Sequence, residues 1–96
     1  MTYHWTSPDS GRIDVTDFRE EPNKLVLKVQ IAKTRRLEAI FCTGGYVLEI
    51  MDAGKCIKEV DYTIIATDVC FMTQGNIIFA EAHLTVDNKK LTERTI

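Results

Sequence analysis

The sequence is poor in the residues that divide a chain into parts or staple it together. It has two prolines, five glycines and three cysteines among 96 residues, with no Pro/Gly/Ser-rich linker and no internal repeat. Nothing therefore divides the chain, and we expect a single domain over residues 1–96. A domain of this length buries only about 60 to 65% of its unfolded surface, which favours further burial in a homodimer.

The sequence also lacks an excess of charge of one sign and any long apolar run. Twelve basic and fourteen acidic residues give a net charge of −2, and the basic residues are scattered. That distribution argues against a nucleic-acid partner. No apolar run approaches the roughly 18 residues that a membrane helix needs, and the first ten residues lack the basic and apolar regions of a signal peptide. We expect contact with neither nucleic acid nor membrane.

The cysteines and histidines form no recognisable metal or catalytic motif. Cys42, Cys56 and Cys70 make an odd number without C-x-x-C spacing, which fits buried thiols in a reducing compartment better than disulfides or a zinc site. His83 stands among polar residues of an alternating segment and is expected at the surface. Nucleotide-loop, zinc-protease and serine-hydrolase motifs are absent. The expected protein is cytoplasmic and carries no metal or other cofactor.

Alternation of apolar and polar residues predicts strands over much of the chain. Residues 24–32 and 76–86 alternate cleanly, as half-buried strands do. Residues 62–73 are largely apolar on both sides, which is typical of a central strand covered on both faces. Residues 12–18 and 90–96 are rich in threonine and charge, as strands at the margin of a sheet are.

Residues 45–61 decide the architecture, because two periods fit them. With a period of two they form a hairpin that turns at Asp52-Ala53-Gly54-Lys55. With a period of 3.6 they form an amphipathic helix, which accounts for more residues and is preferred. The helix predicts an α+β fold, an antiparallel β-sheet wrapped around one central helix; the hairpin predicts an all-β meander, sandwich or barrel. The apolar face of the helix would hold Tyr46, Ile50, Ala53, Ile57 and Val60.

The glycine pair in this segment begins a pattern found in a known family. Residues 43–52, Thr-Gly-Gly-Tyr-Val-Leu-Glu-Ile-Met-Asp, consist of a polar residue, two glycines, a mostly apolar turn and an acidic residue. The segment resembles the motif of hotdog-fold acyl-CoA thioesterases, in many of which the first position is His or Asn, whereas it is Thr43 here. The resemblance implies a hotdog-like fold, a homodimer joined through the sheets, and an acyl-CoA ligand.

The resemblance and the chemistry of a helix start together suggest a thioesterase-like site. Gly44 and Gly45 would let a ligand approach the backbone, and amides at a helix start can hold a thioester carbonyl oxygen. By position in the family pattern, Asp52 is the catalytic carboxylate and Glu49 the second choice. Tyr46 would line the acyl site. The cations that would meet the CoA phosphates are Lys33, Arg35 and Arg36.

A plainer hypothesis competes with this one. A glycine pair followed by an acid is a weak motif, and both carboxylates would simply face solvent on the polar side of a helix. The chain would then be a non-catalytic binding or adaptor module whose antiparallel sheet presents a face or an edge to a partner. The backbone of residues 44–60 separates the hypotheses, because a hairpin removes the amides that a helix start would offer.

Overall fold

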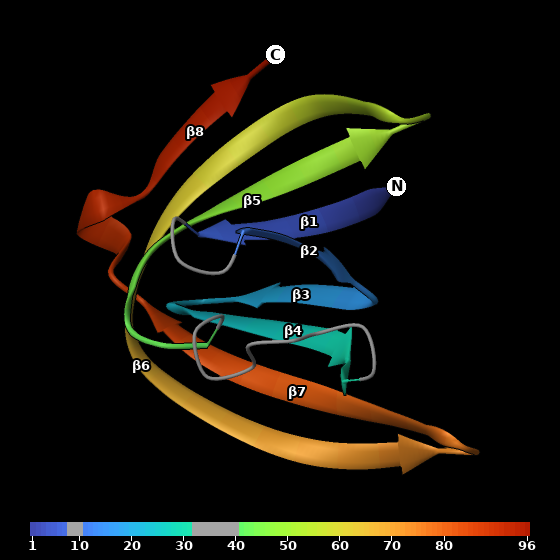
Figure 1. The fold of residues 1–96 in the computed structure, drawn as a ribbon. Coiled ribbons are helices and arrows are strands. Elements are labelled where there is room, and N and C mark those ends of the chain that lie inside the picture. The colour runs from blue at the N-terminus through green and yellow to red at the C-terminus, as the bar shows by residue number, and fades with distance from the viewer. Residues whose placement is uncertain (8–10, 32–40) are drawn as a thin grey trace.

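The chain folds into one antiparallel sheet (Figure 1). A computed structural model describes residues 1–7, 11–31 and 41–96, and these contain eight strands and a short 3-10 helix. The elements are β1 (Thr2–Ser7), β2 (Gly11–Val15), β3 (Asp17–Glu21), β4 (Lys24–Gln30), β5 (Gly44–Asp52), β6 (Lys55–Gln74), β7 (Ile77–Val86), η2 (Asn88–Lys90) and β8 (Thr92–Thr95).

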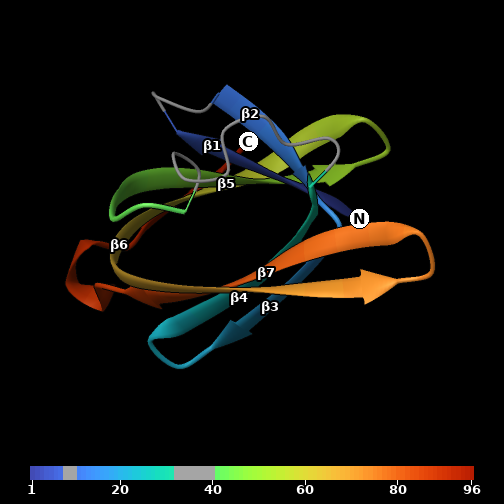
Figure 2. The ribbon, with the colours of Figure 1, turned by 60° about the horizontal axis from the view of Figure 1, so that its bottom comes forward.

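The sheet curls until its two ends meet. The strand order is β2-β1-β5-β6-β7-β4-β3, and β8 pairs with β6 outside this path. β2 and β3 lie at opposite ends of the order, yet only Thr16 separates them in the chain. The Thr16 amide donates a hydrogen bond to the Lys28 carbonyl oxygen of β4 at 2.7 Å. Figure 2 shows the resulting two layers, with β1, β2 and β5 above and β3, β4 and β7 below.

The hydrophobic core fills the space between these layers. Side chains alternate along a strand, so every second residue points inward. The aromatic ring of Trp5 on β1 stacks on that of Tyr46 on β5, with centroids 4.8 Å apart. Strands from both layers supply the interior. The largest fully buried side chains are Trp5, Leu25, Leu27, Leu48, Ile64, Leu84 and Val29.

The strands predicted over residues 24–32, 62–73, 76–86 and 90–96 are confirmed, whereas the single strand predicted over residues 12–18 is divided at Thr16 between two strands. Residues 24–32 and 76–86 contain β4 and β7, whose inward leucine, valine and alanine side chains belong to the core. Residues 12–18 overlap β2 and β3 at the two ends of the strand order, and residues 90–96 contain β8, which lies outside that order. The two segments rich in threonine and charge therefore do form the marginal strands.

The predicted central helix is wrong. Residues 45–61 form β5 and the beginning of β6, joined by a turn at which Asp52 pairs with Lys55. Ala53 and Gly54 occupy that turn with positive φ angles of 50° and 79°, as the central residues of a type I′ turn require. The α+β, hotdog-like fold is therefore contradicted, and the all-β alternative is confirmed.

The core explains why the hairpin forms in place of the helix. The helical pattern omits Leu48, which is 1% exposed, and includes Ala53, which is exposed. The strand period instead places Leu48 opposite Val60, and Tyr46 opposite Tyr62. All four of these side chains are buried. A period of two therefore buries the larger side chains of this segment, and it prevails.

β6 divides at Ile64 into two halves of equal length. The proximal half, residues 55–64, pairs with β5 on one edge and with β8 on the other. The distal half, residues 65–74, pairs with β7, and the tip of this hairpin projects beyond β4 (Figure 1). The prediction that residues 62–73 are covered on both faces is wrong for the distal half, because all of it except Val69 is exposed.

Candidate functional site

The predicted glycine pair lies at the start of a strand. Gly44, with a φ of 136°, pairs with Ile64, and Gly45 pairs with Thr63 in the β5–β6 ladder. The backbone of both glycines is thus part of the sheet. The helix start that was to direct amide groups at a carbonyl oxygen is absent from residues 44–61, so the predicted oxyanion site loses its physical basis.

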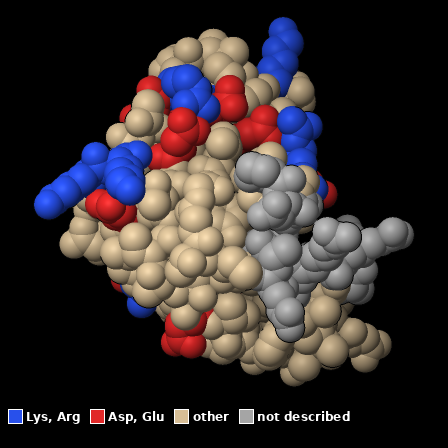
Figure 3. All heavy atoms as spheres, turned by 60° about the vertical axis from the view of Figure 1, so that its left-hand side comes forward, with Lys and Arg blue, Asp and Glu red and all other residues tan. Residues whose placement is uncertain are grey.

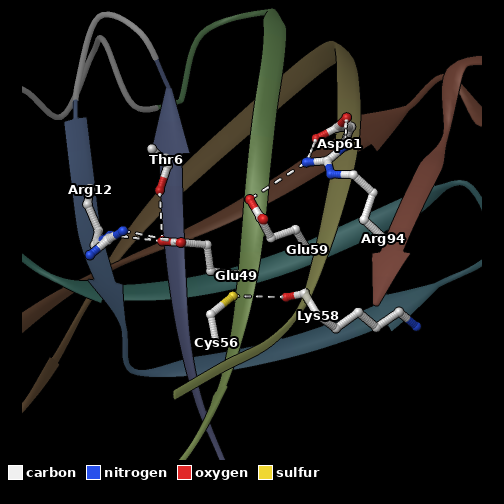
Figure 4. A network of polar contacts seen from close by, with 8 residues as sticks. All are labelled: Thr6, Arg12, Glu49, Cys56, Lys58, Glu59, Asp61 and Arg94. Atoms are coloured by element: carbon white, nitrogen blue, oxygen red, sulfur yellow. Dashed lines mark hydrogen bonds and ion pairs between the residues drawn. The ribbon is translucent and has the colours of Figure 1, made fainter. Parts of the chain in front are cut away.

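The two predicted carboxylates have different surroundings. Arg12 of β2 holds the Glu49 carboxylate, with Nε 2.8 Å from Oε1 and Nη2 3.2 Å from Oε2 (Figure 4). The Thr6 hydroxyl lies 3.5 Å from the same Oε1, and the Glu49 side chain is 13% exposed. Asp52 is exposed at the hairpin turn, where its backbone stands opposite that of Lys55 in the strand ladder. Glu49 is therefore engaged by a cation and Asp52 faces solvent.

His4 extends the ion-pair cluster around Glu49. Its Nε2 lies 3.1 Å from Asp14 Oδ1 on β2, and its Nδ1 lies 3.8 Å from Glu49 Oε1 on β5. Nδ1 is buried and has no hydrogen-bond partner among the described residues. Trp5 points into the core, so the alternation of side chains along β1 places His4 on the outer face, a position that no motif in the sequence indicates. The cluster ties β1, β2 and β5 together.

A second cluster fastens β8 to the proximal half of β6 (Figure 4). Both terminal nitrogens of Arg94 donate to the Asp61 carboxylate, with Nη2 2.9 Å from Oδ1. Nη2 also lies 3.6 Å from Glu59 Oε2, and Lys58 Nζ lies 3.1 Å from Glu93 Oε2. The hydrogen bonds from Arg94 hold the pKa of Asp61 below its ordinary value, against the opposing effect of partial burial.

A hollow of about 530 Å³ opens beside the start of β5. Two of the predicted ligand-binding residues, Gly45 and Tyr46, belong to its wall. A Cβ atom placed on Gly45 would meet no atom within 4 Å, so the missing side chain leaves room here. Burial raises the pKa of the Tyr62 phenol, so this hydroxyl keeps its proton at neutral pH. The lining residues are Thr6, Ser7, Gly45, Tyr46, Val47, Asp61, Tyr62 and Thr63.

Metal ions, membranes, the CoA phosphates and His83 are the remaining subjects of the sequence-based expectations. Within the ranges that the structure describes, no three His, Cys, Asp or Glu side chains are grouped to hold a metal ion. The same ranges contain no helix long and apolar enough to cross a membrane. Lys33, Arg35 and Arg36, predicted to meet the CoA phosphates, lie outside the described residues. His83 Nε2 lies 2.9 Å from Glu81 Oε1 on the same strand.

The cysteines form no disulfide, but they are not buried as predicted. Cys42 and Cys70 are exposed and Cys56 is partly buried; all three lie in the described part of the chain. Cys70 stands in the middle of the distal half of β6, opposite Glu81 of β7. The apolar sequence around Cys70 predicts a buried thiol, and this prediction is wrong for the single chain.

The distal half of β6 presents an open edge. Ile64 pairs with Gly44 of β5 and with Val86 of β7, so these two strands lie on opposite edges of β6. β7 continues along its edge as far as Gln74, whereas β5 begins at Gly44 and runs the other way. No described strand pairs with the β5-side edge of residues 66–74, which we call the open edge. Figure 1 shows it at the lower margin of the molecule.

Apolar side chains flank this open edge. Asp68 is the only charged residue from 62 to 80 in the sequence, and residues 66–74 contain neither lysine nor proline. Figure 3 shows most of the charged side chains of one face gathered in its upper part, above a broad area with few of them. Open strand edges are usually kept from pairing by lysine, proline or a bulge. The register of β6 against β7 shifts between Ile64 and Ala66, so Ile65 is left out of the ladder and the regular edge begins at Ala66. The exposed apolar side chains of this hairpin are Phe71 (61%) and Met72 (38%) on the strand with the open edge, and Ile77 (45%) and Ile78 (49%) on the neighbouring β7.

Comparisons of the chain with protein-family models, with curated proteins and with solved structures find no match. The geometry of the described residues is therefore what bears on function. It offers a hollow beside Gly45, two ion-pair clusters that fasten strands together, and an open, apolar strand edge. Of these three features, the open edge is the least common in a domain that acts alone, because single domains usually protect their strand edges.

Proposed function

We propose that the chain is a non-catalytic binding module that takes up an extended segment of another polypeptide along the open edge of β6. The observation that carries this proposal is the open edge itself, nine residues long, with exposed apolar side chains beside it. The backbone N–H and C=O groups on that side can form a ladder with an added strand, as in other cases of strand addition.

The two faces of the distal half would give an added strand its specificity. Val69 and Phe71 stand opposite Ala82 and Ala80 of β7, which are fully buried, so their side chains belong to the inner face. Met72 lies on the outer face. Because strand residues alternate, an added strand with apolar side chains at every second position would pack on Phe71. Main-chain hydrogen bonds would supply affinity, and this inner face would select the sequence.

The test uses a display library of random decapeptides as probe. Selected peptides should carry alternating apolar residues, and their binding should slow hydrogen exchange at alternate amides of residues 66–74. Only alternate amides respond, since the others already bond to β7. The matched control is residues 58–61 of the proximal half, where β5 and β8 occupy both edges and exchange should not change. Peptides that bind without this alternating protection would refute strand addition.

Binding of an acyl thioester stays a prediction, and the hollow is the place to test it. Gly45→Val would fill part of the hollow, and its backbone accepts a side chain because φ is not positive and the space is empty. Saturable acyl-CoA binding by the wild-type protein, weakened in Gly45→Val, would support that role. Thioester hydrolysis unchanged in Asp52→Asn would remove Asp52 from its predicted catalytic role.

A further inference from the structure

We propose that the strand taken up at the open edge is the same edge of a second copy. Residues 66–74 of two chains would pair antiparallel about a two-fold axis at Cys70, and β7-β6 of one copy would continue into β6-β7 of the other. This inference rests on the proposed strand addition and names its partner.

The length of the open edge fixes the register. Two identical antiparallel strands form the largest number of pairs when the axis passes through the midpoint of the pairing segment. For residues 66–74 that midpoint is Cys70, so Ala66 pairs with Gln74 of the other copy along the whole edge. A displaced axis leaves part of each edge unpaired and costs hydrogen bonds at both ends.

This register also covers exposed apolar side chains. Phe71 of each copy faces Val69 of the other on the inner face, and the axis produces this pair twice. Phe71 is 61% exposed in the single chain, while Val69 is the partly buried residue of the distal half and packs against the core. The dimer therefore continues the apolar inner face of each chain across the joined edges and buries more of Phe71, while the outer face stays exposed.

The charges agree with self-pairing. Asp68 is the only charge on the open edge, and antiparallel pairing about Cys70 places it opposite Met72 of the other copy on the outer face. The two Asp68 carboxylates are thus kept apart, four residues from each other along the ladder. A partner strand of unrelated sequence has no such built-in agreement of length, apolar positions and charge.

The first experiment measures the dimer dissociation constant by light scattering and sedimentation, with charge changes at one exposed position. Met72→Lys places an opposite charge across from Asp68 of the other copy, and Met72→Asp places a like charge there. Both remove the same methionine, so their difference reports the cross-strand contact alone. We expect Met72→Asp to dissociate about tenfold more readily than Met72→Lys.

A charge exchange tests the same contact in reverse. Adding Asp68→Lys to Met72→Asp should restore the affinity, whereas Asp68→Lys with Met72→Lys should weaken it. Ile77→Lys is the matched control, because it adds a charge to the same hairpin on β7, one strand away from the open edge. A dimer that is indifferent to these pairings would overturn the register, and circular dichroism of every variant checks that it folds.

The second experiment uses the thiols at the axis. Directly opposite residues of an antiparallel pair have Cα atoms about 4.5 to 5.5 Å apart, within the range of a disulfide. In a Cys42→Ser, Cys56→Ser background, oxidised glutathione should convert the chain to a covalent dimer through Cys70. The further change Cys70→Ser should abolish this product. If the protein forms a non-covalent dimer but no covalent dimer appears on oxidation, an axis at Cys70 is excluded.

The outcomes separate this inference from the proposed function. A wild-type chain that stays monomeric at micromolar concentration while library peptides protect alternate amides of residues 66–74 overturns self-pairing and leaves strand addition standing. A monomer that selects no such peptide overturns both. A dimer with alternate protection at residues 66–74 and the expected charge dependence supports both.

Discussion

The two halves of β6 differ in their charge and in the pairing of their edges. The proximal half carries four charged residues; β5 pairs with one of its edges, and the short, charged β8 pairs with the other over residues 58–61. The distal half carries one charge and pairs on one edge only. A single continuous strand thus has neighbours on both sides in its first half and on one side in its second half. Strand addition at the distal half, as proposed, would remove this contrast.

The largest expected effect compares truncations in the two halves. Ile64→Ala should lower the free energy of unfolding by about 2 to 5 kcal/mol, because Ile64 is 1% exposed and its removal leaves a cavity. Phe71→Ala should cost the monomer less than about 1 kcal/mol, since most of its ring already faces solvent. Urea denaturation at a concentration below the dimer dissociation constant measures both. Equal losses would mean that the distal half is also complete.

A smaller effect is expected from the turns at the two ends of β6. Ala53 adopts a φ of 50°, which disfavours a residue with a Cβ, so Ala53→Gly should stabilise the chain by about 0.5 to 1 kcal/mol. Gly75 has a φ of 63° in the turn at the distal end, and Gly75→Ala should destabilise by about 1 kcal/mol. Thermal unfolding of the two variants supplies the comparison. A destabilised Ala53→Gly would contradict the turn geometry.

The smallest expected effect concerns pH and belongs to the proximal half. Hydrogen bonds from Arg94 lower the pKa of Asp61 in the folded chain. Their contribution to stability is therefore present above the ordinary aspartate value of 3.8 and is lost as the pH falls through the lowered pKa. Arg94→Gln should be slightly less stable than the wild type at neutral pH, and the gap should close in acid. A constant gap would exclude this linkage.

Local pattern alone predicts several strands of this fold, and tertiary context decides the rest. The alternation over residues 24–32 and 76–86 specifies β4 and β7 because one face of each strand is buried. The 45–61 segment fits both periods, and only the pairing of Leu48 with Val60 in a common core selects the hairpin. The segment alone does not distinguish these alternatives, since the core that buries Leu48 and Val60 is completed by residues of other strands, such as Trp5 and Leu84.

The candidate site depends on contacts that local pattern does not contain. The Gly44–Gly45 motif predicts a helix start, whereas the structure places it in a ladder beside a hollow. The apolar run over residues 62–73 correctly indicates a strand but assigns its cover to the same chain. An apolar composition indicates that side chains are buried, but it does not say whether the same chain or a partner buries them. For this reason the prediction of burial within one chain is wrong, and burial by a partner strand is proposed.

The stacking of Trp5 on Tyr46 gives this protein an internal optical probe. Trp5 is the only tryptophan of the chain; it is fully buried on β1, which pairs with β2 and β5 and not with the distal half of β6. Its fluorescence should follow the opening of the closed core and stay nearly constant when strands add to the distal half. On one unlabelled sample, Trp5 fluorescence can therefore report unfolding while light scattering reports self-association.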